Sequence, residues 1–411
     1  MAKKKFDKNS FFLAILFIIF LIPMILSLTH IGQEGTRQFS MYNTGWDGTS
    51  VLKENLESEG YSIQPILSTL NSLTRVDDLG TLVIMGPTIF YDPTETAALG
   101  YFLARGGSVL LADDFGSAND ILVTLNTVLA PFLDQISAQI SPNETINIPL
   151  RGFKINNSLL MDSQSNHRSP VMPVLRNFYT DSSLPTMTGV NSVVTSFPSA
   201  LSFLVYDNAT ETKKWVPTFT YSGSPIPSGL AISTDKSWLE KDVDKAKSGD
   251  FYPDDDEWGG ISFSVLLPLP ASTVGLGNII LCSDPSIFIN ELITMTQYDN
   301  AQFASNLFNW LDINNTKTIY FDESHLSIAE GQAGLSIIDP FSYMRMYLRI
   351  IDSLTMFPLL APFFPIIAFI YLRRYFPKTK KPKPLLMTKI KQSKSRSFFA
   401  AKMYWYITYQ R

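Results

Sequence analysis

The sequence contains very little cysteine. Its 411 residues include one, Cys282, which excludes an intramolecular disulfide and any zinc site built from several thiolates. The chain also lacks a phosphate-binding loop ending in lysine and serine or threonine. Its glycine-rich run at residues 275–280 has no third glycine and precedes a predicted strand, whereas a dinucleotide site needs its glycines after one. These absences exclude the common nucleotide-binding fingerprints.

Acidic residues are missing from the C-terminal end of the chain. Residues 373–411 contain twelve Lys or Arg and no Asp or Glu, and four lysines with a single aspartate precede residue 11. Subtracting these sixteen basic residues and one acidic residue from the totals of 33 and 37 leaves 17 basic and 36 acidic residues, a formal charge of about −19 for the middle section. Basic ends around an acidic middle are typical of a membrane protein.

Two long apolar segments agree with this charge pattern. Residues 11–28 contain no charged side chain, and residues 356–372 are nearly as apolar and are followed at once by Arg373 and Arg374. Each segment is long enough for a transmembrane helix. The residues after the first segment are a poor match to a signal-peptide cleavage site, so we expect an uncleaved anchor. Because basic flanks remain in the cytoplasm, the sequence predicts a two-pass protein of the cell membrane with both termini cytoplasmic.

The predicted organisation follows from these segments. It comprises a cytoplasmic N-terminus (1–10), a transmembrane helix (11–30), an extracytoplasmic domain (31–350), a second transmembrane helix (354–372) and a basic cytoplasmic tail (373–411). We expect the tail to bind membrane lipids and not nucleic acid, since basic residues just inside a membrane attract anionic headgroups. Candidate N-glycosylation patterns lie in the predicted outer domain, at Asn143, Asn156, Asn208 and Asn314.

Strands alternate with helices at both ends of the predicted outer domain. The first set has strands at residues 38–42, 61–66, 81–87 and 108–112 and helices at 51–59 and 93–105; the second has strands at 278–282 and 317–321 and a helix at 300–311. Such alternation indicates an α/β domain with a doubly wound, mostly parallel sheet of the flavodoxin-like kind. Between the two sets, from about residue 140 to 270, short β-prone runs predict a β-rich elaboration.

Ionisable side chains gather where predicted strands end. In an open parallel sheet, ligands bind at the carboxyl ends of the strands. Converging carboxylates there could bind a divalent cation or the hydroxyls of a sugar; the simpler alternative is that each caps a helix or turn. The acidic residues at 254–257 lack the spacing of a calcium loop, and we expect no metal and no cofactor. The residues at strand ends are Asp113, Asp114, Asp284, Asp322, Glu323 and His325.

Several sequence blocks resemble a known family. YNTGWDGTS (42–50), VIMGP (83–87) and GGSVLLADDFGSAN (106–119), in this order, resemble a prokaryotic membrane-anchored family of unknown function. Its outer domain is similar to class I glutamine amidotransferases without their activity. SWLEKD (237–242) and GNIILCSDPSIFIN (277–290) also resemble related gliding-motility and ABC-transporter auxiliary proteins. The resemblance implies a fold and an anchored topology, and it adds Asn43, Asp47, Asn119 and Asn290 to the candidate ligand-binding residues.

The residues at the expected nucleophile position argue against amidotransferase chemistry. That chemistry needs an activated thiolate on a strand-to-helix elbow, where this chain has Asp113, Asp114 and Phe115. We therefore expect a non-enzymatic binding or scaffold protein, an accessory subunit of a transport or envelope-assembly complex with a membrane-complex protein as partner. One alternative is a hydrolase or amidase that uses Cys282 and His325 with Glu323 orienting the histidine. Another is a rigid spacer without a site.

Overall fold

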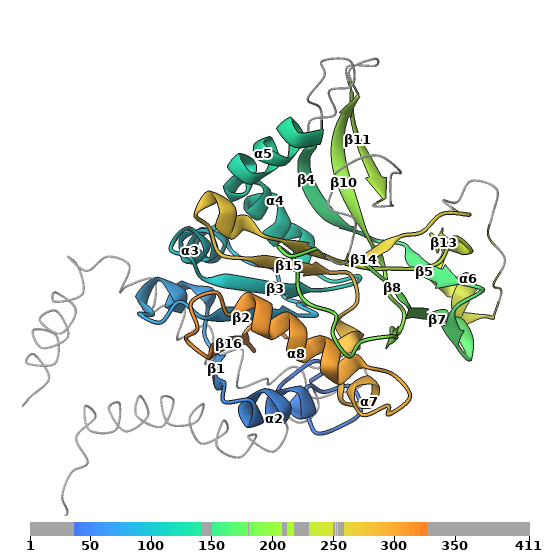
Figure 1. Cartoon of the computed structure of the whole chain (residues 1–411), viewed down its shortest axis with the longest axis horizontal. Helices are drawn as coiled ribbons and strands as arrows, with labels where there is room; N and C mark the ends of the chain where they lie inside the picture. Colours follow the sequence, from blue (N-terminus) through green and yellow to red (C-terminus); the bar gives the residue numbers. More distant parts are fainter. Residues whose placement is uncertain are drawn as a thin grey trace, which may run out of the picture. The chain divides into compact units, whose positions relative to one another are not determined.

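An eight-stranded sheet forms the centre of the protein in this computed structural model (Figure 1), which describes residues 37–140, 150–179, 181–207, 212–217, 230–249, 251, 253 and 259–326. The first five strands in spatial order are parallel, and the last three are antiparallel to their neighbours. The order is β1 (Ser62–Ile66), β16 (Thr318–Asp322), β2 (Thr81–Met85), β3 (Ser108–Ala112), β15 (Ile279–Cys282), β14 (Ser264–Leu269), β12 (Ala231–Ile232) and β8 (Asn177–Phe178).

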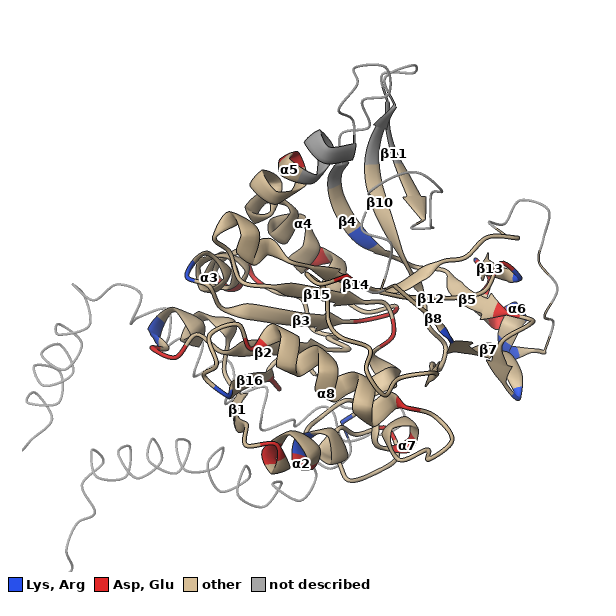
Figure 2. Ribbon diagram, viewed as in Figure 1, with Lys and Arg blue, Asp and Glu red and all other residues tan. Residues whose placement is uncertain are grey.

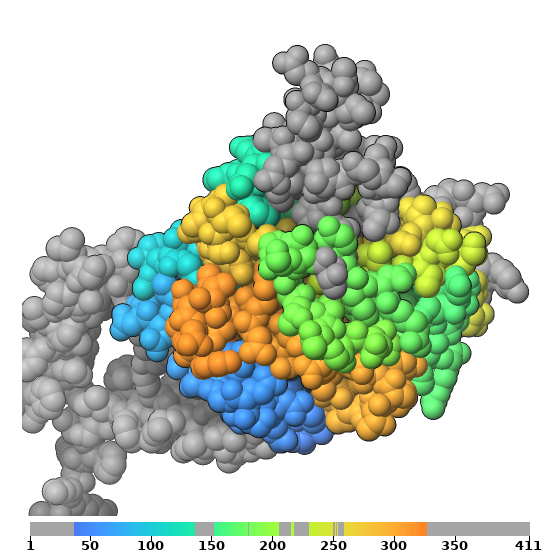
Figure 3. Space-filling model, viewed as in Figure 1, coloured from blue at the N-terminus to red at the C-terminus, as the bar shows by residue number. Residues whose placement is uncertain are grey.

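Helices cover both faces of this sheet. Successive residues of a strand point to opposite sides, and the central strands carry apolar side chains on both sides, which the helices bury. Val83 and Met85 of β2 pack on the face of α2 (Ser50–Ser58), α7 (Asn290–Ile293) and α8 (Asn300–Leu311). Leu82 and Ile84 pack on the face of η2 (Leu70–Arg75), α3 (Pro93–Ala104), α4 (Ala118–Val128) and α5 (Ala130–Ile140). On the face seen in Figure 3, the segment with α2 (blue) lies against the region of α8 (orange). The predicted α/β class with a mostly parallel sheet is confirmed.

The β-rich elaboration is also confirmed within the described residues. Its antiparallel strands form three small sheets, and β14, β12 and β8 extend the central sheet beyond β15. The first small sheet has β11 (Thr212–Pro217), β10 (Ala200–Asp207) and β4 (Leu150–Asn156); the second has β13 (Ser237–Glu240) and β5 (Leu159–Asp162); the third has β6 (Asn166–His167), β7 (Ser169–Leu175) and β9 (Val193–Val194). Three short helices complete the described elements: α6 (Val243–Lys247), η3 (Ala271–Val274) and η4 (Pro285–Phe288).

Local signals explain where α3 begins and ends. The Asp92 side chain accepts hydrogen bonds from the backbone N–H groups of Thr94 and Glu95, at 2.8 and 3.0 Å, and the Glu95 carboxylate accepts the Asp92 N–H in return, at 3.1 Å. This capping box satisfies amide groups that the first helical turn leaves without partners. After the helix, Gly106 adopts a φ of 98°, which glycine reaches without a steric penalty.

The strand predicted at residues 38–42 is wrong. This segment forms turns instead, and Phe39 has a φ of 62°. Its ring packs against Gly86, where a Cβ atom would clash with it. Phe39 and Met41 are both buried, so two apolar side chains enter the core from a turn and not from a strand.

The predicted membrane spans, 11–30 and 354–372, and the two flanking segments, 1–10 and 373–411, lie outside the described residues. Asn143, Asn208 and the acidic run at 254–257 also lie outside them. In the described part of the chain, no helix combines the length and apolar character needed to cross a bilayer.

Candidate functional site

The connections after β3 and β15 leave the sheet toward opposite faces. The chain continues from β3 into α4 on one face and from β15 into η4, α7 and α8 on the other. The border between these parallel strands is therefore a topological switch point, where open α/β sheets bind ligands. Asp113 N–H donates to the Cys282 carbonyl across this border, at 3.0 Å. β3 carries no charged residue. Asp113 and Asp114 lie in the loop that follows the strand (Figure 2).

Two of the three acids at the switch point cap neighbouring helical turns. The Asp113 carboxylate accepts from the N–H groups of Gly116 and Ala118, at 3.1 and 2.9 Å, and so holds the start of α4. The Asp284 carboxylate accepts from Ser286, at 2.8 Å, and from Ser196 of the elaboration, at 3.0 Å. Both carboxylates are buried. The prediction that these acids share one edge is thus correct, and the capping alternative describes their bonds.

Asp114 differs from the other two because it is only half-buried. Its carboxylate accepts from the Phe115 N–H, at 2.6 Å. Burial raises the pKa of all three acids, to about 8 for Asp284, about 7 for Asp113 and about 6 for Asp114. Repulsion by Asp114 is the next cause of the raised pKa of Asp284 and Asp113, while backbone N–H donors oppose it. Each of the three acids is therefore partly protonated near neutral pH. Asp114 is the one of them that solvent reaches.

The residues after β16 form a second, fully buried cluster around His325. Its Nδ1 lies 2.8 Å from the Asp322 Oδ2, and its Nε2 lies 3.3 Å from the Glu95 Oε1. The Tyr91 hydroxyl donates to Asp322 at 2.9 Å, and its ring stacks on the imidazole with centroids 3.8 Å apart. Ser324 Oγ donates to Asp322 at 2.6 Å. Because Ser324 and Asp322 both lie at Nδ1, the group is not a serine–histidine–aspartate triad, which needs them on opposite nitrogens.

Charge compensation keeps the imidazole protonated. Burial alone lowers the pKa of His325, but Asp322 and Glu95 overcome it and raise the pKa to about 9. Burial in turn raises the pKa of Asp322, and the imidazolium with its hydrogen bonds outweighs burial and lowers it overall. The cluster fixes the end of β16 to the start of α3. Glu95 and Tyr91 are not among the residues predicted from the sequence. The signal available for Glu95 is a carboxylate in the first turn of an otherwise apolar helix.

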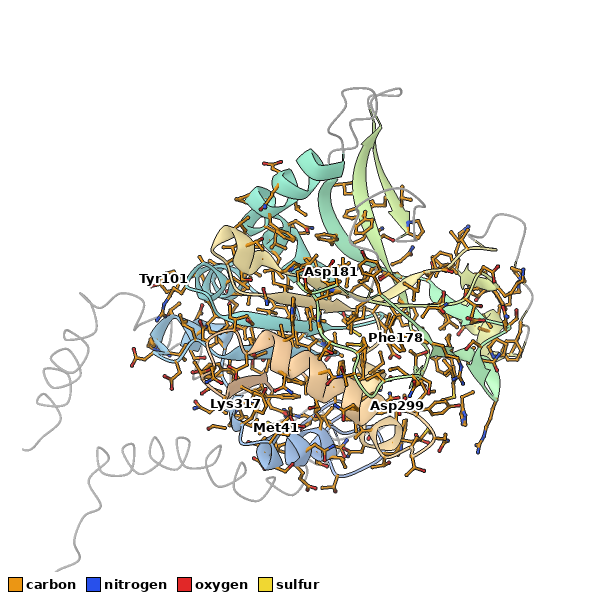
Figure 4. All side chains as sticks on the ribbon, in the orientation of Figure 1. Met41, Tyr101, Phe178, Asp181, Asp299 and Lys317 are labelled. Carbon is orange, nitrogen blue, oxygen red and sulfur yellow. The ribbon has the colours of Figure 1, made fainter. Side chains whose placement is uncertain are left out.

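Cys282 and His325 do not form a catalytic couple. Their strands, β15 and β16, are separated by β3 and β2, which sets the two strands about 14 Å apart. The imidazole nitrogens of His325 instead contact Asp322, Ser324 and Glu95. The Cys282 thiol is buried and donates to the Asp284 carbonyl at 3.2 Å, and burial raises its pKa well above the ordinary value. Glu323 does not orient the histidine in the structure, because its Oε1 accepts the N–H of Met41 at 2.7 Å. Figure 4 labels Met41.

Glu323 joins the two ends of the described chain. Burial raises its pKa to about 7, while the bonds from Met41 and Ser40 and the nearby Arg37 oppose that shift. Glu323 N–H also donates to the Ile66 carbonyl at the end of β1, at 3.0 Å. Asp322 and Glu323 therefore bind different neighbours, although they are adjacent in the sequence.

Asn290 holds the turn at residues 43–48. Its Nδ2 donates to the carbonyls of Asn43 and Gly45, at 3.0 and 2.7 Å, and its Oδ1 accepts the Val51 N–H, at 2.8 Å. That last bond serves as an N-cap for α2, since the Thr49 side chain makes none. Within the turn, Asn43 Nδ2 donates to Asp47 Oδ1 at 2.9 Å.

The remaining candidates are also engaged within the protein. Asn119 pairs with the backbone of Ile155 through both its Nδ2 and Oδ1, at 3.0 and 2.9 Å, and so ties α4 to β4. Of the glycosylation candidates, Asn156 is half-buried in β4 and donates to Ser202, while Asn314 is exposed and donates to two backbone carbonyls. In the ranges that the structure describes, no set of three or more His, Cys, Asp or Glu is arranged to hold a metal ion.

A family profile matches most of this architecture. The profile of the domain of unknown function DUF4350 covers residues 41–308, from the turn after Phe39 into α8. The chain belongs to the DUF4350 family. The membership agrees with the resemblance to a family of unknown function and gives no activity.

Two further comparisons add little to the DUF4350 assignment. No curated protein matches the chain. Among solved structures, the mmIFT52 N-terminal domain is similar, with 13% sequence identity over 67% of this chain and 94% of that one and a TM-score of 0.43. This distant likeness carries no argument about function.

Proposed function

We propose that this DUF4350 protein is a non-enzymatic, membrane-anchored binding or scaffold protein with an extracytoplasmic domain. It acts as an accessory subunit of a transport or envelope-assembly complex. In this proposal residues 11–30 and 354–372 cross the cell membrane, the basic tail binds lipid headgroups, and a protein of the complex binds the outer domain. In the same proposal, the outer domain has an amidotransferase-like, flavodoxin-like sheet. The protein is then related to gliding-motility and ABC-transporter auxiliary proteins.

The observation that carries the proposal is the environment of the two candidate reactive groups. The thiol of Cys282 is buried with a raised pKa, and the imidazole of His325 is held as a cation between two carboxylates. A thiol needs to ionise to act as a nucleophile, and a protonated imidazole cannot accept its proton. Neither group is therefore poised for hydrolysis.

Asp114 is the group at the switch point that a partner could contact. It is half-buried, whereas Asp113 and Asp284 are buried and bonded. A basic or hydroxyl-bearing group on the partner would pair with its carboxylate. Binding would also favour ionisation of Asp114, whose pKa is raised to about 6.

A topology measurement and a charge reversal test the proposal. Protease treatment of intact cells should remove the domain at residues 37–326 and spare the tail; protection of the domain would contradict the outward orientation.

In native membranes, Asp114→Lys should weaken chemical cross-linking to the complex partner at least several-fold. Asp120→Lys, on the exposed part of α4, is the matched control. Equal cross-linking by both variants would contradict a role for the switch point and favour the rigid spacer.

A further inference from the structure

Three large aromatic side chains stand exposed on neighbouring turns at the carboxyl edge of the sheet. Trp46 is 65% exposed, Phe90 is 73% exposed and Phe115 is 39% exposed. Phe90 lies between β2 and α3, Phe115 lies between β3 and α4, and Trp46 lies in the turn that Asn290 holds. We call Trp46, Phe90 and Phe115 the aromatic edge.

Hydrogen bonds and packing connect these three turns. Ser117, two residues after Phe115, donates its N–H to the Pro87 carbonyl at 2.9 Å and its Oγ to the Ile89 carbonyl at 3.1 Å. The turns with Phe90 and Phe115 are thus held side by side. On the other side, Phe39 packs its ring against Gly86 and donates its N–H to the carbonyl of Asp47, next to Trp46, at 2.9 Å.

Both ends of the described domain meet the same turns. At the C-terminal end, the His325 carbonyl accepts the N–H groups of Thr88 and Ile89, at 2.9 and 3.1 Å. At the N-terminal end, Arg37 precedes Phe39 by two residues, and its carbonyl accepts the Asn43 Nδ2 at 2.9 Å. The chain therefore enters and leaves the domain beside the aromatic edge.

The sequence limits how far this edge can lie from the first apolar segment. Eight residues, 29–36, separate residue 28 from Arg37, and an extended chain of that length spans roughly 30 Å at most. If residues 11–30 cross the bilayer, Arg37 stays within that distance of the membrane surface, and the aromatic edge beside it stays near the surface. The second connection, residues 327–355, is longer and sets a weaker limit.

We infer that the aromatic edge faces the membrane and that Trp46, Phe90 and Phe115 enter the interfacial layer of the lipid bilayer. The inference rests on the proposed anchoring. Trp and other aromatic side chains favour the level of the headgroups. A protein interface typically has a continuous apolar patch, whereas these three rings stand singly on separate turns. Such an arrangement suits insertion into a fluid lipid surface better than binding to a protein. The half-buried Asp114, adjacent to Phe115, would then lie at the membrane surface, so that its partner must be reachable there.

The single buried cysteine makes this orientation measurable. Because Cys282 is 0% exposed, a nitroxide reagent can be directed to a cysteine introduced at Phe90→Cys or Trp46→Cys in the otherwise intact chain. Tyr101→Cys is the matched control, since Tyr101 is 52% exposed near the opposite end of α3 (Figure 4). Thr88→Cys, on an exposed position of the Phe90 turn, provides a second label if either aromatic substitution impairs folding.

The full-length variants are reconstituted into vesicles of phosphatidylcholine and phosphatidylglycerol, and collisions of each label with oxygen and with a water-soluble nickel complex are compared. We expect the ratio of oxygen to nickel collisions at position 90 or 46 to exceed that at position 101 several-fold. Equal ratios at all positions, or a label shielded from both reagents as in a protein contact, would overturn the inference. Alkaline extraction of the same vesicles separates the two proposals: a chain that is released was never anchored, whereas a retained chain with equal ratios contradicts the orientation alone.

Discussion

Glu95 and His325 lie 230 positions apart in the chain, yet the carboxylate of the first is 3.3 Å from the Nε2 of the second. This ion pair joins the start of α3 to the last described strand. Asp322 completes it on the other side of the ring, so that one buried cation faces two buried carboxylates. Glu95 is the second counter-charge of His325, so its removal loses a charge-assisted hydrogen bond while Asp322 still balances the imidazolium.

Glu95→Gln should therefore destabilise the domain by about 2 kcal/mol, the contribution of a hydrogen bond between charged groups. A glutamine keeps the shape and can still accept a backbone N–H, so the loss reports the missing charge. For a domain of this size the unfolding midpoint should fall by roughly 3–4 °C, measured on full-length protein in detergent. Glu54→Gln, on the exposed side of α2, is the control and should leave the midpoint unchanged. Equal midpoints for the two variants would show that the charge of Glu95 contributes little to the free energy of unfolding.

Stability should decrease as the pH rises from 5 to 9. The pKa of His325 is raised to about 9, so its contribution is complete below the ordinary value of about 6.5 and is lost as the pH approaches 9. The raised pKa values of Asp284 and Asp113, about 8 and about 7, act in the same direction. Their buried neutral forms favour the folded state, and that advantage is lost between pH 3.8 and the folded pKa.

Unfolding midpoints measured across this pH range check the prediction. Asp284→Asn should flatten the curve between pH 6 and 8, because the substituted side chain cannot ionise. A midpoint that increases from pH 5 to 9 would contradict both the histidine and the aspartate assignments.

Asn290→Ala should destabilise the domain by about 2–3 kcal/mol, because it removes a helix N-cap, a bond to the buried Asn43 carbonyl and a bond to the Gly45 carbonyl. The expected structural effect is release of the turn at residues 43–48 from α2, which faster hydrogen exchange of the Val51 amide would report. Asn157→Ala is a suitable comparison, since Asn157 is exposed and contacts Asn119 at 3.4 Å. Unchanged exchange at Val51 would show that the cap is dispensable.

Cys282 should react slowly with maleimide in the native chain and completely after denaturation. Burial keeps the reagent away, and the raised pKa keeps the thiol protonated. Intact-mass measurement of the full-length protein gives both rates, and a cysteine at Phe90→Cys serves as a fast-reacting reference in the same chain. Rapid native labelling of Cys282 itself would revive the hydrolase alternative.

Sequence signals predicted those parts of the fold that depend on neighbouring residues. The bounds of β3 and α8 match the predicted ones, because a short apolar run and helical spacing of Phe303 and Leu307 are local features. The predicted start of the helix at residue 93 is also correct, because Asp92 and Pro93 are local signals for a helix N-terminus. The false strand at residues 38–42 shows the limit, since Phe39 is placed by its packing on Gly86.

The sequence predicted where the residues of the candidate site lie better than it predicted which groups they bind. The sequence placed Asp113 and Asp284 at one edge, because both follow parallel strands. It did not show that Ser196, from the elaboration, would bind Asp284. It also did not reveal Glu95 as the partner of His325, because that contact depends on the order of strands, which no local pattern encodes.

The strand order has a consequence for biosynthesis. In the described sheet, β1 has a single neighbour, β16, which comes more than 250 residues later in the chain. Strands β2 and β3 can pair soon after they are made, but the earliest strand must wait, unpaired, until the final one is inserted beside it. The nascent domain therefore exposes an incomplete edge for nearly all of its synthesis, and we expect a chaperone to protect that edge until β16 is made.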